Sequence, residues 1–313
     1  MAGRVVIRQG NRLLSRLVNI DRDLLVIPGV AIHMDRSVNK GAELNPAVDL
    51  LPLLGCGKEP GAFRKLIAEA AGVREEHLLS TELFLYPRTR AVQTGLQGEF
   101  IVSPRLDDLQ CVFGCLEGFL AAKPGGSLPV LAVFNNEEVG SNTRQGADST
   151  FLTDVLERIA DGCGLNREEW KAAVANSFLV SADNAHAIHP AHPEYADKGE
   201  FPVLNGGIVI KYNANQRYTT DAVSGAVFQA ICQEAGVPVQ RYSNRADLPG
   251  GSTLGNISTA HLSVPTVDIG LPQLAMHSVC ETAGAADTDH LVKAMTAYFS
   301  RDFHRDRDGG IVF

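Results

Sequence analysis

The sequence predicts an α/β protein with a smaller β-rich part at its N-terminal end. From Phe100 onward, apolar runs of strand length alternate with amphipathic helical patterns, which is typical of a sheet covered by helices on both faces. Between residues 4 and 98, short alternating segments are broken by Gly, Asn and Pro. The 313 residues, 45% of them apolar, are enough for two domains. We therefore expect a β-rich domain over residues 1–98 and an α/β domain over residues 99–313.

The elements of the first part follow from period-2 and period-3.6 patterns. One helical pattern covers Ala62–Ala71 and is closed by Gly72. Strands are expected around Val5–Ile7, Leu13–Leu17, Leu25–Ile27 and Leu83–Tyr86.

In the second part, each expected strand is followed by an expected helix or by a polar loop. The strands are expected at residues 100–104, 128–134, 177–183, 206–213 and 264–270. The helices are expected at residues 106–122, 149–160, 166–176, 219–236 and 287–300.

Charge and composition exclude several classes of partner. Thirty-six acidic residues against 28 basic ones give a net charge of −8 with no basic stripe, so a nucleic-acid partner is not expected. No apolar run approaches the roughly 18 residues of a membrane span, and the N-terminus lacks the apolar core of a signal peptide. The six cysteines are scattered without a CxxC pair, which predicts buried free thiols and a reducing, cytoplasmic location.

Acidic residues and one imidazole follow the predicted strands of the second part. Asp107 and Asp108 follow the first strand, the Glu137–Glu138 pair follows the second, Asp183 ends the third, and His277 follows the fifth. Loops at the carboxyl ends of strands converge on one crevice in open α/β sheets. Taken singly, each residue has a simpler interpretation as a helix-start acid, a solvated loop charge, a turn former or an ordinary histidine. Gathered at one edge, they predict a metal site.

Carboxylates with one imidazole suit two neighbouring divalent cations better than a single histidine-rich zinc. A shared carboxylate offsets the charge of both ions, and the ions lower the pKa of water to about 7. A second carboxylate beside that water can accept its proton and pass it to a leaving amine. The consecutive glutamates at 137 and 138 suit such a division, because neighbouring side chains project differently.

Several strings of this sequence resemble the M18 family of metallo-aminopeptidases, the aspartyl aminopeptidase group. They are SPRLDDLQ at 103–110, NNEEVGS at 135–141, SADNAHAIHP at 181–190, KYNANQRY at 211–218 and VDIGLPQLAMHS at 267–278. MAGRVVIR at 1–8 and AIHMDR at 31–36 are similar to segments of the family's inserted domain. The resemblance implies the helix-covered mixed sheet of a co-catalytic metallopeptidase, with a β-rich domain that contributes to homo-oligomers.

The resemblance also implies a role for individual positions. Asp107 matches the carboxylate that bridges two zinc ions, Glu138 and His277 match the other ligands of one ion, and Asp183 matches a ligand of the second. Glu137 matches the general base. His186, Lys211 and Tyr218 match positions that line the pocket for peptide substrates, and His33 matches a histidine that reaches a neighbouring subunit's site.

The sequence departs from the family at its beginning, which leaves three interpretations open. Family members carry an HTDS-like segment, with a histidine ligand of the second zinc, before the position that matches Met1. We therefore expect the second zinc position to be incomplete and activity to be low. The chain is then an aminopeptidase with a possible preference for acidic residues, a catalytically inactive homologue that acts only in assembly, or a related metallo-deacylase.

Overall fold

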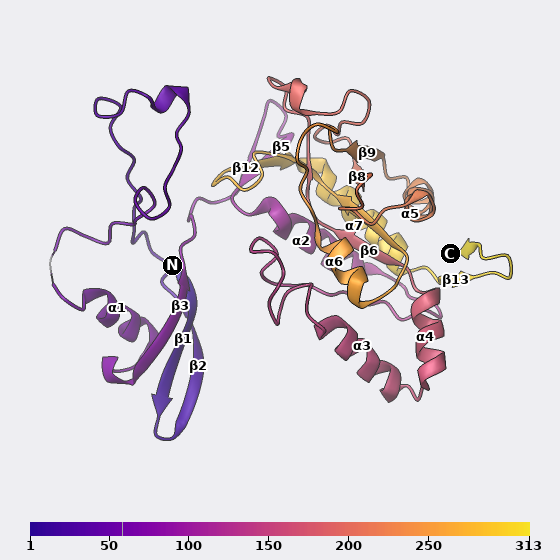
Figure 1. Cartoon of the computed structure of the whole chain (residues 1–313), viewed down its shortest axis with the longest axis horizontal. Coiled ribbons are helices and arrows are strands. Elements are labelled where there is room, and N and C mark those ends of the chain that lie inside the picture. The colour runs from indigo at the N-terminus through magenta and orange to yellow at the C-terminus, as the bar shows by residue number, and fades with distance from the viewer. Residues whose placement is uncertain (58) are drawn as a thin grey trace. The chain divides into compact units, whose positions relative to one another are not determined.

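The structure, a computed structural model, describes residues 1–57 and 59–313, which form two compact units, Met1–Arg88 and Thr89–Phe313 (Figure 1). The second unit begins earlier than the residue 99 expected from the change in pattern. Strand β4 (Val92–Thr94) pairs with β5 (Phe100–Ser103), so the residues between them belong to the second unit.

The first unit is a three-stranded antiparallel sheet packed against one helix. Its strands are β1 (Ala2–Gln9), β2 (Arg12–Asn19) and β3 (Leu78–Phe84), in the order β2-β1-β3. Helix α1 (Ala62–Ala71) has the predicted bounds. It ends where Gly72 adopts a φ of 65° and donates its N–H to the carbonyls of Ala68 and Glu69. The remaining elements are the short 3-10 helices η1 (Val38–Lys40) and η2 (Glu75–His77).

One predicted strand of this unit is wrong. The segment Leu25–Ile27 forms a single bridge, between Val26 and Leu53, instead of a strand. Leu24 and Leu25 pack in part against the core of the unit, whereas Val26 and Ile27 are exposed, and the segment has no further strand to pair with among the described residues.

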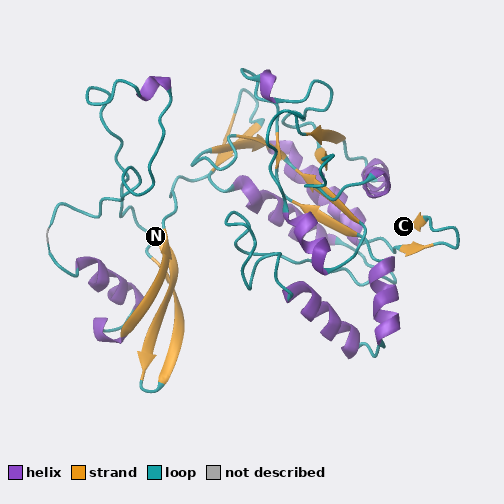
Figure 2. Ribbon diagram, viewed as in Figure 1, coloured by secondary structure: helices purple, strands orange, loops and turns teal. Residues whose placement is uncertain are grey.

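The second unit contains a four-stranded mixed sheet with helices around it, which confirms the predicted α/β class (Figure 2). Strand β10 pairs with β6 in parallel and with β8 in antiparallel fashion, while β8 and β9 are parallel. The strands, in sheet order, are β6 (Leu179–Ala182), β10 (Thr266–Gly270), β8 (Ile208–Tyr212) and β9 (Val239–Ser243). The helices are α2 (Leu106–Ala121), α3 (Phe151–Gly162), α4 (Arg167–Asn176), η3 (Pro193–Tyr195), α5 (Ala222–Glu234), α6 (Leu254–His261) and α7 (Ala285–Phe299).

A second sheet in this unit was not expected from the sequence. Its order is β4-β5-β12-β11-β7, and it is antiparallel except for the pairing of β11 with β7. The strands not yet bounded are β7 (Ala185–His186), β11 (Pro272–Leu274) and β12 (Glu281–Gly284); a separate ladder joins β13 (His304–Arg305) and β14 (Ile311–Val312).

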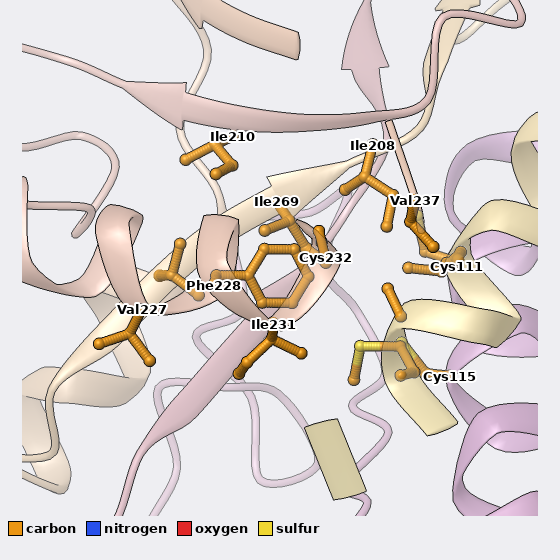
Figure 3. Packing of buried hydrophobic residues seen from close by; sticks show 14 of the residues in the cluster. Cys111, Cys115, Ile208, Ile210, Val227, Phe228, Ile231, Cys232, Val237 and Ile269 are labelled. Carbon is orange, nitrogen blue, oxygen red and sulfur yellow. The ribbon is translucent and has the colours of Figure 1, made fainter. Parts of the chain in front are cut away.

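The core of the second unit lies between the mixed sheet and its helices (Figure 3). Phe228 and Ile231 of α5 pack against Ile208 and Ile269 of the sheet, and all four side chains are inaccessible to solvent. Such burial contributes about 1.5–3 kcal/mol per large apolar side chain, and it holds the loops at the strand ends in place.

Helices α2 and α7 approach closely because α2 carries glycine where they meet. A Cβ atom on Gly114 would lie 2.6 Å from Leu291 Cδ2, and one on Gly118 would lie 2.5 Å from Met295 Cβ. Glycine at both positions therefore lets α7 support the helix that begins beside Asp107.

The segment 128–134 is a loop that forms no ladder with the described residues, so the strand predicted there is wrong. Its alternating pattern meets the local requirement of a strand, but a strand also needs a hydrogen-bonded neighbour. Helix α6, by contrast, forms where no helix was expected, in a segment whose glycine and β-branched residues give only weak helix propensity.

The cysteines are free, as expected, but only Cys111, Cys115 and Cys232 are buried, whereas Cys56, Cys163 and Cys280 are exposed. Among the described residues, no helix has both the length and the apolar character needed to cross a bilayer.

Candidate metal centre

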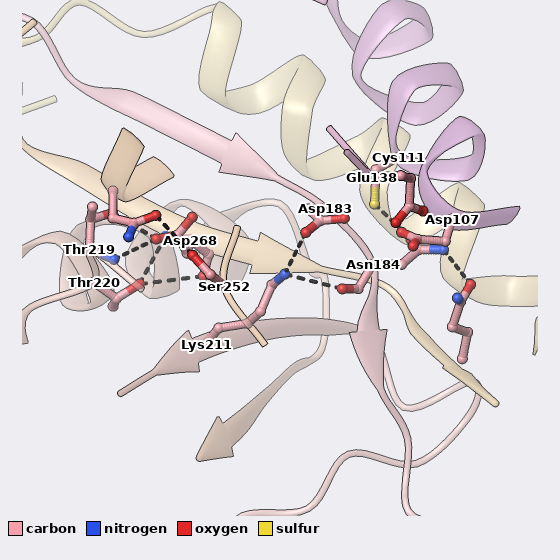
Figure 4. A network of polar contacts seen from close by, with 12 residues as sticks. Asp107, Cys111, Glu138, Asp183, Asn184, Lys211, Thr219, Thr220, Ser252 and Asp268 are labelled. Atoms are coloured by element: carbon pink, nitrogen blue, oxygen red, sulfur yellow. Dashed lines mark hydrogen bonds and ion pairs between the residues drawn. The ribbon is translucent and has the colours of Figure 1, made fainter. Parts of the chain in front are cut away.

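Side chains from four separate segments of the second unit converge on one cluster. Figure 4 shows three of them, Asp107, Glu138 and Asp183. Asp107 and Asp108 lie at the start of α2, Glu138 lies in a turn that follows the segment 128–134, Asp183 follows β6, and His277 lies in the loop between β11 and β12. The convergence differs from the expected one. Asp107 follows β5, a strand of the second sheet, so the cluster forms where two sheets meet and not along the edge of one.

The first group of candidate ligands is Asp107, Glu138 and His277, whose ligand atoms lie within 4.8 Å of one another. Nε2 of His277 is 3.1 Å from Oδ2 of Asp107 and 3.2 Å from Oε2 of Glu138. Two carboxylates and an imidazole are donors that zinc accepts readily, and three protein ligands leave a position open in a tetrahedral site.

The second group is Asp107, Asp108 and Asp183, which also lie within 4.8 Å of one another. Asp107 belongs to both groups, as a bridging carboxylate would. Sequence reasoning placed Asp108 at the start of the helix but gave it no role. In the sequence, the signal for Asp108 was its position directly after Asp107. In the structure, the backbone leaves helical geometry at both residues, and the two carboxylates reach one cluster.

The electrostatics of the cluster fit a divalent cation. The Asp107 side chain is only 6% exposed, and Oδ1 of Asp107 and Oδ1 of Asp108 are buried without a hydrogen-bond partner. Burial, together with the negative charges of Asp183 and Glu138, raises the pKa of Asp107 to about 8; burial and Asp183 also raise the pKa of Asp108. Buried carboxylates without enough neighbouring cations are unfavourable, and a bound metal ion removes that cost.

Glu137 lies beside the cluster in a turn that holds its own backbone. Ser141 donates its N–H to the carbonyl of Asn136, whose φ is 60°, and Gly140 donates to the carbonyl of Glu137. Burial, followed by the charges of Asp183 and Glu138, raises the pKa of Glu137. A carboxylate with a raised pKa suits a group that accepts and returns a proton near neutral pH.

Lys211 is the buried cation nearest Asp183 in the described cluster. Its Nζ lies 3.6 Å from Oδ2 of Asp183 and donates to the carbonyl of Asn184 at 3.1 Å. Burial opposes the charge, yet Asp183 and other neighbours raise the pKa of Lys211 above its usual value. The Tyr218 ring centroid is 5.3 Å from the same Nζ, so the two predicted pocket residues lie side by side.

His186 borders a cavity of about 280 Å³ next to this group. Its ring centroid is 6.1 Å from that of Tyr242, which in turn is 6.3 Å from Tyr218. Loss of solvent around the ring, followed by the Lys211 charge, lowers the pKa of His186. Tyr242, which sequence reasoning missed, therefore connects His186 with the pair formed by Lys211 and Tyr218.

His33 is the one predicted site residue outside the second unit. It lies on an exposed turn of the first unit, and its role toward a neighbouring copy stays a prediction.

Sequence reasoning also missed Glu281, the first residue of β12. Its Oε2 accepts the backbone N–H of Asp107 at 3.0 Å, and its Oε1 accepts the backbone N–H of His277 at 2.8 Å. The sequence carries no signal for this contact, because it joins residues 174 positions apart and acts on the main chain.

Known proteins that are similar to this chain share one family description. The family profile described as "Aminopeptidase I zinc metalloprotease (M18)" matches residues 1–299. The "Probable M18 family aminopeptidase 2" of Clostridium acetobutylicum is 44% identical over 306 residues, which cover 96% of this chain and 71% of that protein.

Two solved structures have the same fold. A chain in the "Cryo-EM structure of the Ape4 and Nbr1 complex" matches with a TM-score of 0.87 and 35% identity, covering 95% of this chain and 62% of the other. The "Structure of S. cerevesiae mApe1 dodecamer" matches with a TM-score of 0.76 and 25% identity, covering 95% and 68%. The chain therefore spans about two thirds of these proteins.

Proposed function

The chain belongs to the M18 family of zinc metallo-aminopeptidases, and from this premise we propose that it removes the N-terminal residue of peptides by zinc-dependent hydrolysis. The single observation that carries the proposal is the pair of ligand groups that share Asp107. Asp107, Glu138 and His277 would hold one zinc ion, and Asp107 with Asp183 would contribute to a second. When bound, zinc polarises a carbonyl group and makes water acidic enough to attack it at neutral pH.

The remaining steps belong to side chains of this chain. Glu137, beside the ligands but outside both groups, accepts the proton of the attacking water and delivers it to the leaving amine. The hydrogen-bonded turn that carries Glu137 keeps the carboxylate beside the cluster. Neither transfer requires Glu137 to leave its place, because the water oxygen that loses the proton and the amine nitrogen that receives it are bonded to the same carbon between the two transfers.

We assign the substrate's first side chain to the group formed by His186, Lys211 and Tyr218. An acidic side chain there would gain from the Lys211 charge, which supports a preference for N-terminal Asp or Glu. We expect this preference for acidic residues to be moderate and not absolute, because Asp183 already offsets part of the Lys211 charge.

We also propose that the protein acts as a cytoplasmic homo-oligomer in which His33 reaches the site of a neighbouring copy. Between residues 21 and 61, none of the described residues is buried, although many are apolar, including Ile32, Met34 and Leu51. An apolar surface of this kind is typical of an interface. The solved mApe1 structure is that of a dodecamer, which supports assembly here by analogy.

The proposal is tested with the Glu137→Gln variant and the wild-type chain, both loaded with zinc. We expect equal zinc content, and a kcat for peptides with a free N-terminus that is about 10²–10⁴-fold lower in the variant, because general-base transfer is lost. Zinc content is measured by atomic emission and hydrolysis by release of the first amino acid.

Two outcomes would contradict the proposal and favour its alternatives. A wild-type chain that binds zinc but releases no amino acid would favour the inactive homologue that acts in assembly. Hydrolysis of N-acylated amino acids in preference to peptides with a free N-terminus would favour a metallo-deacylase.

A further inference from the structure

We infer that Glu281 is a positioning residue that sets the separation of Asp107 and His277 before a metal ion binds. Its two carboxylate oxygens each accept a backbone N–H from one of these residues, at 3.0 Å and 2.8 Å. The side chains of the same two residues meet at 3.1 Å, between Oδ2 and Nε2. A single carboxylate thus holds the main chain behind two ligands of one candidate site. The inference rests on the metal site of the proposed function.

The surroundings of Glu281 favour a rigid support. The residue is 2% exposed, and it begins β12 opposite Ser103 of β5, four residues before Asp107. Strand β12 also pairs with β11, so Glu281 lies at the base of the loop that carries His277. Two sheet pairings therefore fix the carboxylate between the start of α2 and that loop.

The loop needs such a support because its backbone is held in an uncommon conformation. His277 has a φ of 67° and Ala275 a φ of 56°, values that residues other than glycine seldom adopt. Surrounding contacts must maintain this conformation, and the bond from the His277 N–H to Glu281 is one of them. With the side chain of His277 61% exposed, few packing contacts could replace the bond.

The test compares Glu281→Gln with a matched control, Asp287→Asn. The amide of the first variant presents an N–H₂ group to one of the two N–H donors, so one hydrogen bond is lost. Asp287 is also fully buried and accepts two backbone N–H groups, from Asn205 and Gly207, but it contacts no candidate ligand. We expect both variants to melt at lower temperature, whereas only Glu281→Gln weakens zinc binding, by about 10–100-fold.

Zinc affinity is measured by competition with a chromophoric chelator, and the cobalt-loaded forms are compared by visible absorption. A changed cobalt spectrum in Glu281→Gln alone would indicate displaced ligands. Equal zinc affinity in Glu281→Gln and the wild type, or an equal loss in both variants, would overturn the inference. A wild-type chain that binds no zinc would instead overturn the metal site, and the positioning role with it.

Hydrogen exchange on the metal-free wild-type chain tests the same idea without a variant that has to fold. The amide of His277 should exchange at least about 10-fold more slowly than the amides of Val279 and Met276 in the same loop, because a formed hydrogen bond protects it. Exchange of all three at similar rates would contradict a preformed bond to Glu281.

Discussion

At the residue scale, the site combines acids whose burial is unfavourable on their own with one cation that offsets part of their charge. Lys211 is 2% exposed and lies 3.6 Å from Asp183, while its Nζ also faces the ring of Tyr218. Removing this charge therefore affects a candidate ligand and the candidate pocket together. Loss of the charge in the pocket should slow acidic substrates more than neutral ones, whereas loss of support for Asp183 should slow all substrates alike. Kinetics with both kinds of substrate can therefore separate the two effects.

We predict that Lys211→Met lowers the preference for acidic over neutral N-terminal residues. The ratio of kcat/KM for a glutamyl substrate to that for a leucyl substrate should fall about 10–100-fold, the value of one charged hydrogen bond. Lys211→Arg, which keeps the charge, should retain most of the ratio. If both substrates slow equally in Lys211→Met, Lys211 supports Asp183 and does not recognise the substrate.

Residue types and their order along the chain allowed much of the candidate site to be anticipated. Asp107, Glu138, Asp183 and His277 stand out because acids and an imidazole follow predicted strands, and the structure brings them together. Glu281 could not be anticipated, since its carboxylate acts on backbone N–H groups that any residue carries. The sequence shows Asp108 beside Asp107, but the direction of its carboxylate depends on the backbone conformation at the start of α2.

At the element scale, helices were predicted better than strands. The bounds of α1 follow from its own periodicity and from Gly72, both local features. Strands depend on partners far along the chain: segment 128–134 has the right pattern but no ladder among the described residues, and β11 and β12 form a hairpin that no pattern indicated. The second sheet, which supports Asp107 and His277, was missed for this reason.

The contact between α2 and α7 gives a prediction at this scale. An alanine at position 118 would place its Cβ 2.9 Å from the backbone nitrogen of Thr296, so the helices must separate. Overpacking costs about 1–3 kcal/mol, and the roughly 1 kcal/mol that alanine gains over glycine within a helix offsets part of that cost. We therefore expect Gly118→Ala to lower the free energy of unfolding by up to about 2 kcal/mol.

Urea unfolding measures the effect, and Gly162→Ala is the control. Gly162 is the last residue of α3, and an added Cβ there meets nothing within 4 Å. The control should leave the free energy of unfolding unchanged or raise it. An equal change in both variants would contradict close packing of α2 against α7.

At the scale of the whole molecule, the exposed apolar side chains of the first unit are concentrated in one stretch of chain. Most of them follow one another along a single segment between Val26 and Leu54 that has little secondary structure of its own. Such a segment cannot bury its apolar side chains locally. Association with a second copy would bury them, and it would also let His33 of one copy reach the site of the other.

We therefore predict that charges on this segment dissociate the oligomer. Met34 is 85% exposed and Ile32 lies two residues away, so Ile32→Asp combined with Met34→Asp places two carboxylates in the proposed interface without disturbing a buried side chain. The mass from analytical ultracentrifugation should fall to that of smaller species. Leu96→Asp is the control, since Leu96 is 96% exposed but belongs to the second unit. An unchanged mass in the double variant, or an equal fall in the control, would contradict assembly through residues 26–54.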